Sequence, residues 1–263
     1  MELGLTEKVV LVAASSRGLG RAVAEELAEE GASLILCARG EALLNEVCDS
    51  LSPKIGGRIL GVPADLAVTT DVERVVQLGL ERFGYIDILV TNTGGPPAGQ
   101  FESLSRHAWE EATRLLLTSV LDLTRLVLPG MKARGWGRIL NVTSIAVKQP
   151  VDNLMLSNSL RAAVTGFART LANEVAACGI TVNNLLPGYT RTERVEQLAD
   201  ALAAKEEITP AEVRARWEAA IPMQRLGEPR EFAALAAFLV SERASYITGS
   251  SIAVDGGWIR SLL

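Results

Sequence analysis

Ser157 and Arg161 lie four residues apart, and their side-chain types point most directly to chemistry at an oxygen atom. The Ser157 hydroxyl can donate a hydrogen bond to a substrate oxygen, but an aliphatic hydroxyl is a poor source of protons near neutral pH. Arg161 keeps a fixed positive charge and several donors, so it can stabilise a developing oxyanion. The pair predicts a site that polarises an oxygen atom but supplies a proton poorly.

The segments around the pair predict the elements that hold it. Residues 139–144 read as a buried strand that ends in Ser144, and a helix rich in alanine runs on from Arg161. Elsewhere, apolar runs of strand length alternate with longer amphipathic segments, of which residues 18–30 and 41–51 are two predicted helices. The seven predicted strands span residues 8–13, 33–37, 58–62, 86–91, 138–142, 181–186 and 251–254.

This alternation predicts the fold class. Apolar strands that alternate with helices are typical of a parallel sheet covered by helices on both faces. A chain of 263 residues with 48% hydrophobic content is long enough to bury one large core. We therefore expect a single α/β domain over residues 1–263, a Rossmann-like doubly wound parallel sheet of about seven strands.

The turn after the first predicted strand has the composition of a phosphate-binding turn. Residues 12–20 read Val-Ala-Ala-Ser-Ser-Arg-Gly-Leu-Gly and open the first predicted helix. Small residues at such a turn let backbone N–H groups and the positive end of the helix approach a pyrophosphate closely. A plain strand-to-helix connection is the other interpretation, and the position after the first strand favours nucleotide binding.

Together these features resemble the short-chain dehydrogenase/reductase family. In that family a strand-end serine lies thirteen residues before a catalytic tyrosine, and a lysine follows four residues later. Thirteen residues beyond Ser144 this chain has Ser157 and then Arg161, and the family's site asparagine corresponds to Leu116. The resemblance implies that Ser144 orients a carbonyl oxygen, and that Ser157 and Arg161 take the places of the acid/base pair. We therefore expect the scaffold of a hydride-transfer enzyme with an altered proton supply.

The resemblance also implies a dinucleotide site along the carboxyl ends of the strands. Ala14 stands where the family has a glycine, and because alanine resists positive φ we expect an altered turn there. Thr192 takes the hydroxyl position of the loop that meets the nicotinamide carboxamide. The expected cofactor-binding residues are Ala14, Ser16, Arg17, Gly18, Leu19, Gly20, Arg39, Asp65, Leu66, Asn92, Gly94, Arg161, Pro187, Gly188 and Thr192.

The end of the second predicted strand indicates which nucleotide fits. NAD-binding enzymes of this kind place an acid there against the adenosine ribose, and this strand ends Cys-Ala-Arg without one. Arg17 and Arg39 could together hold a 2′-phosphate through charge-assisted hydrogen bonds, so we expect NADP(H) in preference to NAD(H). The alternative is that both arginines are solvated surface residues.

Composition excludes several classes of partner. A formal net charge of −5 with only short single-sign runs argues against a nucleic acid or an anionic membrane. No signal peptide precedes the first predicted strand, and no apolar run reaches the ~18 residues of a membrane span, so we expect a cytoplasmic protein. The three cysteines are isolated from one another, and no metal site is expected.

A long connection follows Gly188. We expect residues 189–224 to form a helical substrate lid, because Thr209, Pro210 and Glu212 have the spacing of a capped helix start. Tyr189 and Lys148 are the alternative proton donors nearest to the predicted site, whereas the single histidine, His107, is expected at an exposed helix start.

Three functions remain open at this level. The first is an NADP(H)-linked oxidoreductase, similar to 3-oxoacyl-acyl-carrier-protein reductases, acting on an apolar carbonyl compound or secondary alcohol. The second is a nucleotide-binding pseudoenzyme with a regulatory or structural role, and the third is a lyase or isomerase that uses the same pocket without net redox change. The fold cannot choose among them. The resemblance also implies a homo-oligomer, a tetramer or a dimer.

Overall fold

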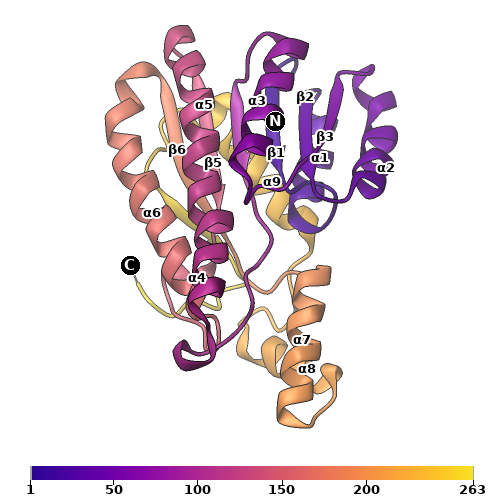
Figure 1. Ribbon diagram of the computed structural model, residues 1–263, viewed down its shortest axis with the longest axis vertical. Helices are drawn as coiled ribbons and strands as arrows, with labels where there is room; N and C mark the ends of the chain where they lie inside the picture. Colours follow the sequence, from indigo (N-terminus) through magenta and orange to yellow (C-terminus); the bar gives the residue numbers. More distant parts are fainter. Residues whose placement is uncertain (1, 263) are drawn as a thin grey trace.

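The computed structural model describes residues 2–262, which form one parallel seven-stranded sheet flanked by helices (Figure 1). The strand order is β3-β2-β1-β4-β5-β6-β7, and every pairing is parallel. The strands are β1 (Val9–Ala13), β2 (Ser33–Ala38), β3 (Ile59–Pro63), β4 (Ile88–Thr91), β5 (Gly137–Val142), β6 (Ile180–Pro187) and β7 (Ser251–Val254). The expected Rossmann-like fold is confirmed.

Nine α-helices occur among residues 2–262. They are α1 (Gly18–Glu29), α2 (Glu41–Leu51), α3 (Thr69–Phe83), α4 (Arg106–Thr113), α5 (Ser119–Arg134), α6 (Met155–Val175), α7 (Glu193–Glu206), α8 (Pro210–Ala220) and α9 (Pro229–Leu239). No helix in this part of the chain combines the length and the apolar composition that crossing a membrane requires.

Alternation along the strands divides the core into two layers. Val10 and Val12 of β1 point to the face covered by α1, α2 and α9, whereas Val9 and Leu11 point to the face covered by α3, α5 and α6. Successive side chains of a strand point to opposite faces, so a strand buried on both sides is mostly apolar. All five residues of β1 and all six of β2 are buried, and Ser33 at the start of β2 is the one polar residue in these two strands.

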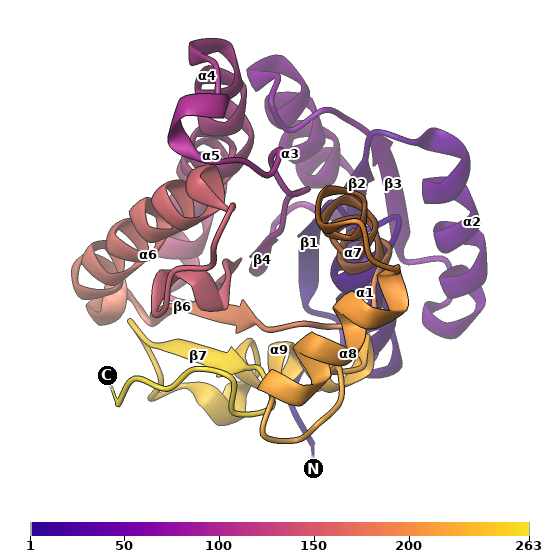
Figure 2. The same ribbon diagram turned by 90° about the horizontal axis from the view of Figure 1, so that it is seen from below.

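The strand order reverses direction between β1 and β4. The connections from these two strands run to opposite sides of the sheet, which opens a crevice at their carboxyl ends. Figure 2 looks onto this edge, with β1 and β4 near the centre, α6 on one side and α7 and α8 on the other. The fold thus brings the turn after β1, the end of β5 and the start of α6 to one place.

Helix α8 begins as its sequence predicts. The Thr209 hydroxyl accepts a hydrogen bond from the Glu212 N–H at 3.2 Å, and a Glu212 carboxylate oxygen accepts one from the Thr209 N–H at 2.8 Å. This reciprocal capping box satisfies two amides that the first turn would otherwise leave without partners. The segment after Gly188 is therefore folded into two helices, α7 and α8, that pack on one another.

Candidate functional site

A cleft of about 540 Å³ lies at the carboxyl edge of the sheet. It is lined by the turn after β1, by residues that follow β2, β4 and β5, and by the first turns of α6 and α7. The residues singled out from the sequence that line it are Ala14, Ser16, Arg17, Gly18, Leu19, Arg39, Asp65, Leu66, Asn92, Gly94, Ser144, Ser157, Arg161, Pro187, Gly188 and Thr192. Gly20 does not line the cleft.

Gly20 instead packs against Ala14 and Asn92, two residues that line the cleft. A Cβ atom at this position would lie 2.3 Å from the Ala14 carbonyl oxygen and 2.8 Å from the Asn92 side-chain nitrogen. The Asn92 amide also donates a hydrogen bond to the Ala14 carbonyl at 3.2 Å. Helix α1 can therefore approach the turn this closely only because residue 20 has no side chain, and Asn92 ties the turn to the end of β4.

Ala14 takes the backbone conformation that alanine resists. Its φ is 50°, in the left-handed region, and Gly18 in the same turn has a φ of 56°. The left-handed conformation costs an L-residue roughly 1–2 kcal/mol. The Ser15 N–H donates to the Cys37 carbonyl at 3.1 Å, which fixes the turn from its other side. The turn therefore keeps a left-handed residue at position 14, and the Ala14 backbone is strained as a result.

The N-terminus of α1 faces the cleft without a partner from its own residues. Arg17 is the N-cap and supplies no side-chain cap, and the first turn holds no acidic residue. Unpaired N–H groups and the helix dipole make such an end suitable for an anion. Gly18 and Leu19 of this turn line the cleft. The residues present therefore fit a nucleotide pyrophosphate at this point.

Arg17 and Arg39 differ in what surrounds them. The Arg17 guanidinium forms an ion pair with Glu193 at the start of α7. Arg39 is exposed directly after β2, and its side chain forms no ion pair or hydrogen bond within the described chain. Arg39 is therefore the arginine better placed for a 2′-phosphate, and Arg17 links the turn to α7.

Asp65 is fixed by local hydrogen bonds after β3. Its carboxylate accepts a hydrogen bond from the Ala67 N–H at 2.9 Å, and its own N–H donates to the Asp71 carboxylate at 2.8 Å. These contacts and Arg74 lower the pKa of Asp71, the backbone hydrogen bond from Asp65 contributing most. The turn that carries Asp65 and Leu66 is therefore held rigidly at the edge of the cleft.

Ser144 is oriented by its own backbone. It is the N-cap of a short 3-10 turn, η4 (Ile145–Val147), and its hydroxyl oxygen accepts a hydrogen bond from the Ala146 N–H at 3.1 Å. A serine oxygen that accepts this bond keeps its O–H free to donate. Because Ser144 lines the cleft, that donor is available to a bound oxygen atom.

Ser157 and Arg161 lie on the face of α6 that meets the cleft. Ser157 is 7% exposed, and its hydroxyl has no hydrogen-bond partner among residues 2–262. The Arg161 guanidinium donates to the Val142 carbonyl, at the end of β5, over 2.8 Å. Burial, together with the positive charge of Arg194, lowers the pKa of Arg161 to about 10. Arg161 therefore remains charged at neutral pH.

Leu116 belongs to the core and not to the cleft. It lies in a π-helical turn, η3 (Arg114–Thr118), that joins α4 to α5, and it is 2% exposed. It packs with Ala112, Leu156 and Leu160. The neighbouring Leu115 lines the cleft. Leu116, which the resemblance aligns with the family's asparagine, is thus an apolar side chain buried in the core.

None of the alternative proton donors is suited to protonate a substrate in the cleft. His107 is exposed and lies 3.3 Å from Glu111, as expected, and Lys148 is exposed and does not line the cleft. Tyr189 does line it, stacked on Trp217 at 4.7 Å between ring centres. Burial, with the nearby charge of Asp152, raises the pKa of Tyr189. A phenol with a raised pKa is a weaker acid, so Tyr189 does not replace the missing tyrosine.

Arg194 is a cleft residue that the sequence motifs did not reveal. Its guanidinium donates to the Pro96 carbonyl at 2.8 Å, and burial lowers its pKa. It is the second residue of α7, where a positive charge is unfavourable to the helix dipole. An arginine in the first turn of a predicted helix is the feature of the sequence that could have indicated a role for Arg194. Among residues 2–262, no three histidine, cysteine, aspartate or glutamate side chains are grouped to hold a metal ion.

Comparison with known proteins identifies the family. Residues 13–259 match the family described as "Enoyl-(Acyl carrier protein) reductase". The chain is similar to the 3-oxoacyl-[acyl-carrier-protein] reductase of Vibrio cholerae, at 35% identity over 97% of this chain and 98% of that protein. It is also 33% identical to dehydrogenase/reductase SDR family member 4 of Oryctolagus cuniculus, over 96% of this chain and 94% of that protein.

Solved structures agree with these relatives. The L-sorbose reductase of Gluconobacter frateurii, complexed with NADPH and L-sorbose, matches all of both chains with a TM-score of 0.94 and 35% identity. An actinorhodin polyketide ketoreductase with NADPH matches 97% of this chain and 98% of its own with a TM-score of 0.92 and 32% identity. The strand order, the glycine-rich turn and these likenesses lead to one conclusion: the chain belongs to the short-chain dehydrogenase/reductase family.

Proposed function

We propose that this protein is an NADP(H)-linked oxidoreductase that interconverts a carbonyl compound and a secondary alcohol. The observation that carries the proposal is that one cleft joins the phosphate-suited turn after β1 to the side chains of Ser144, Ser157 and Arg161. Relatives at about this level of identity are reductases, and two structural neighbours hold NADPH. A 3-oxoacyl thioester or a similar ketone is the substrate class that these relatives suggest.

The chain's own residues fit the nucleotide along the length of the cleft. The N-terminus of α1 would hold the pyrophosphate, and Arg39 the 2′-phosphate. Arg161 would hold the ribose hydroxyls next to the nicotinamide, and Asn92 keeps the turn under the nucleotide in place. When bound, the reduced nicotinamide supplies a hydride to the carbonyl carbon.

The reacting oxygen is bound by hydroxyl and guanidinium donors. The Ser144 O–H is free to donate because its oxygen already accepts from Ala146. Ser157 provides a second hydroxyl that has no partner in the described chain. As negative charge develops on the carbonyl oxygen, the fixed charge of Arg161 stabilises it. These donors polarise the carbonyl group without giving up a proton of their own.

The proton for the alcohol comes from solvent in this scheme. Each turnover adds one hydride to the carbonyl carbon and one proton to its oxygen. Ser157 and Arg161 are poor proton sources, and the pKa of Tyr189 is raised. Water that reaches the open cleft therefore protonates the alkoxide, which predicts a slow chemical step compared with an enzyme that holds an acid at this place.

Two experiments test the proposal in sequence. Fluorescence titration with NADPH and NADH measures binding, and single-turnover mixing with short 3-oxoacyl thioesters and small ketones measures hydride transfer. We expect tight NADPH binding and slow oxidation of the bound NADPH. Failure to bind either nucleotide would end the proposal, and so would tight binding with no oxidation by any of these carbonyl compounds.

One observation favours a second candidate function. Leu116 is sealed in an apolar cluster, so the chain lacks three of the four groups with which the family moves protons. A protein that binds NADP(H) without turning it over, and that uses nucleotide occupancy for assembly or regulation, is consistent with this loss. NADPH binding without oxidation is the result that selects this candidate.

Arg39 tests the cofactor preference. Arg39→Ala should weaken NADPH binding about 10-fold and leave NADH binding nearly unchanged, because only NADPH carries the 2′-phosphate that a charge-assisted hydrogen bond would hold. Parallel fluorescence titrations of the two nucleotides measure the ratio. Arg243→Ala is the control, since Arg243 lies at the opposite edge of the sheet beside Glu242. Equal losses of NADPH and NADH affinity would contradict the assignment.

We also propose that residues 189–224, which contain α7 and α8, form a lid over the substrate. Two contacts tie α7 to the body of the protein, the Arg17–Glu193 ion pair and the hydrogen bond from Arg194 to the Pro96 carbonyl.

Helix α6 has an exposed face that a second copy of the chain could cover, formed by the small residues Ala162, Ala163 and Gly166. We expect a homo-oligomer, and analytical ultracentrifugation measures its size.

A further inference from the structure

Arg161 and Arg194 line the same cleft, and neither has an acidic partner within the described residues. Arg161 reaches the Val142 carbonyl at the end of β5, and Arg194 reaches the Pro96 carbonyl in the segment after β4. Strands β4 and β5 are paired neighbours, so both guanidinium groups lie over the same part of the sheet edge. No carboxylate within residues 2–262 forms an ion pair with either arginine.

The backbone provides a seat for Arg194. A Cβ atom on Gly95 would lie 2.5 Å from its side-chain Nε and 2.7 Å from the central guanidinium carbon. The planar group therefore rests directly against the Gly95 backbone, and any side chain at residue 95 would displace it. Together with the hydrogen bond to Pro96, this contact fixes the direction in which the remaining N–H donors point.

The charge balance of the cleft is opposite to that of the chain. The whole protein carries a formal charge of −5, but the charged residues lining the cleft are mostly cations. The charged lining residues are Arg17, Arg39, Arg161, Arg194, Asp65 and Glu193. Glu193 is already paired with Arg17. Half-buried cations without partners are costly, and the positive end of α7 lies at the same point, so an anion bound there is strongly favoured.

We infer that the substrate carries a carboxylate group as well as its carbonyl group, and that Arg194, seated on Gly95 beside Arg161, binds that carboxylate. The inference rests on the proposed oxidoreductase function and names its substrate class, an oxo acid. Arg161 then faces the reacting oxygen while Arg194 offers two parallel N–H donors to the carboxylate. Apolar lining residues, among them Val151, Leu154 and Leu198, accommodate the rest of the molecule.

A nucleotide pyrophosphate carries the same anionic oxygens, so the experiment must separate the two sources. The probes are 4-oxopentanoate and 3-oxobutanoate, each paired with its methyl ester, titrated by calorimetry into the protein saturated with NADP⁺. The acid and ester of a pair differ in the charge of the carboxyl end and in one methyl group. Binding of NADPH is measured separately on each variant.

Arg194→Met is the decisive variant. We expect it to weaken binding of the two acids about 10- to 100-fold, the loss of a charge-assisted contact, and to change ester and NADPH binding by less than about 2-fold. Arg216→Met is the matched control, because Arg216 lies on α8 in an exposed ion pair with Glu206 and does not line the cleft. It should change neither acid nor nucleotide binding.

Gly95→Ala separates position from charge. It keeps the Arg194 cation but displaces the guanidinium from its seat, so acid binding should fall while ester binding stays constant. If the Gly95→Ala variant binds the acids as well as the unchanged protein does, contact with Gly95 does not position the Arg194 guanidinium. An acid that binds no better than its ester in the unchanged protein would overturn the inference, as would an Arg194→Met variant that loses NADPH affinity to the same extent as acid affinity.

These outcomes are independent of turnover. If no carbonyl compound oxidises NADPH, the proposed function fails, and the calorimetric comparison still decides whether Arg194 binds a carboxylate. If NADPH is oxidised equally well by acids and by esters, the proposed function stands and the carboxylate inference fails.

Discussion

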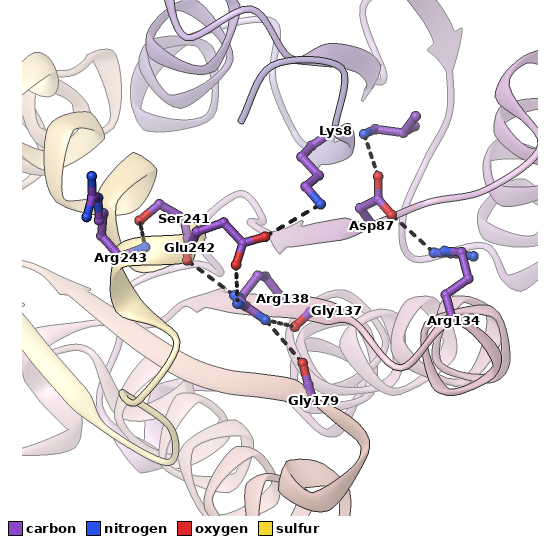
Figure 3. Close-up of polar contacts among 10 residues, drawn as sticks. Lys8, Asp87, Arg134, Gly137, Arg138, Gly179, Ser241, Glu242 and Arg243 are labelled. Atoms are coloured by element: carbon purple, nitrogen blue, oxygen red, sulfur yellow. Dashed lines mark hydrogen bonds and ion pairs between the residues drawn. The ribbon is translucent and has the colours of Figure 1, made fainter. Parts of the chain in front are cut away.

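The charged side chains at the amino ends of the strands and those at the carboxyl ends differ in how fully the protein pairs them. At the amino edge, the Arg138 side chain is 3% exposed and donates to the Gly137 carbonyl at 2.8 Å and the Gly179 carbonyl at 3.2 Å (Figure 3). It also lies 3.7 Å from the Glu242 carboxylate and stacks over Trp136. Its Nε also donates to the Ser241 carbonyl at 3.4 Å, so this guanidinium has three backbone acceptors and one acidic partner.

Asp87, which precedes the neighbouring strand β4, has a similar arrangement of partners. Its carboxylate accepts a hydrogen bond from the Val9 N–H at 3.0 Å and lies 3.4 Å from the Arg134 guanidinium (Figure 3). The Val9 bond joins the starts of β1 and β4, and Arg138 joins β5 to the segments before β6 and after α9. The amino edge is thus held together by its own polar groups.

At the carboxyl edge the corresponding groups are left incomplete. Ser157 has no hydroxyl partner among residues 2–262, and Arg161 and Arg194 each donate to one carbonyl and pair with no acid. Buried polar groups without partners are costly, so they persist where a ligand completes them. The difference teaches that polar groups at the amino edge maintain the fold, whereas those at the carboxyl edge are left available for a ligand.

Replacing Arg138 should give the largest effect. Arg138→Met leaves two buried carbonyl groups without their donor, so we expect the free energy of unfolding to fall by about 3 kcal/mol. Urea denaturation measures it. Arg161→Met is the matched change at the other edge and should cost less than about 1 kcal/mol, because it also removes an uncompensated charge. Equal losses at the two edges would break the comparison.

Restoring a phenol and an amine should change chemistry but not stability. Ser157→Tyr combined with Arg161→Lys places an acid of pKa about 10 beside a cation that lowers it, so we expect reduction of a short 3-oxoacyl thioester to accelerate about 100-fold or more. Single-turnover mixing with NADPH measures the rate. Arg161→Lys alone is the control and should give no gain. An unchanged rate in the double variant would mean that the cleft, or the apolar packing around Leu116 beside it, has diverged too far.

Ala14 offers the smallest and most local test. Ala14→Gly relieves about 1 kcal/mol of left-handed strain and adds about 0.5 kcal/mol of backbone entropy to the unfolded chain, so a net gain of about 0.5 kcal/mol is expected. Ala13→Gly, one residue earlier and inside β1, is the control and should destabilise the protein by about 1 kcal/mol. Thermal denaturation of both variants measures the sign, and a loss in both would show that Ala14 is not strained.

Local sequence patterns predict most of the strands, the start of α8 and the turn after β1. The apolar runs predict the strands because a strand buried on both faces is mostly apolar, and the capping box at Thr209 and Glu212 predicts the start of α8 because its partners are three residues apart. The turn after β1 was found in the same way. The identity of its first residue indicated strain, and the positive φ of Ala14 is that strain in the structure.

Contacts between segments far apart in the chain could not be predicted from the sequence. The Arg17–Glu193 pair joins residues 176 apart, and the Arg194–Pro96 contact joins residues 98 apart. Nothing in either local sequence indicates the other, because the two meet only after α7 has folded back over the carboxyl edge. Gly20 shows a related limit, since its sequence position suggested a ligand contact and its real neighbours are Ala14 and Asn92.

The aromatic cluster beside the cleft gives this protein an internal optical reporter. Tyr189 stacks on Trp217 and meets Trp258 edge to face at 6.0 Å, so two of the four tryptophans adjoin the cleft. Indole emission overlaps the absorption band of reduced nicotinamides and not that of oxidised ones. Resonance energy transfer from these two indoles would therefore distinguish the reduced from the oxidised nucleotide within the protein itself, without any attached dye.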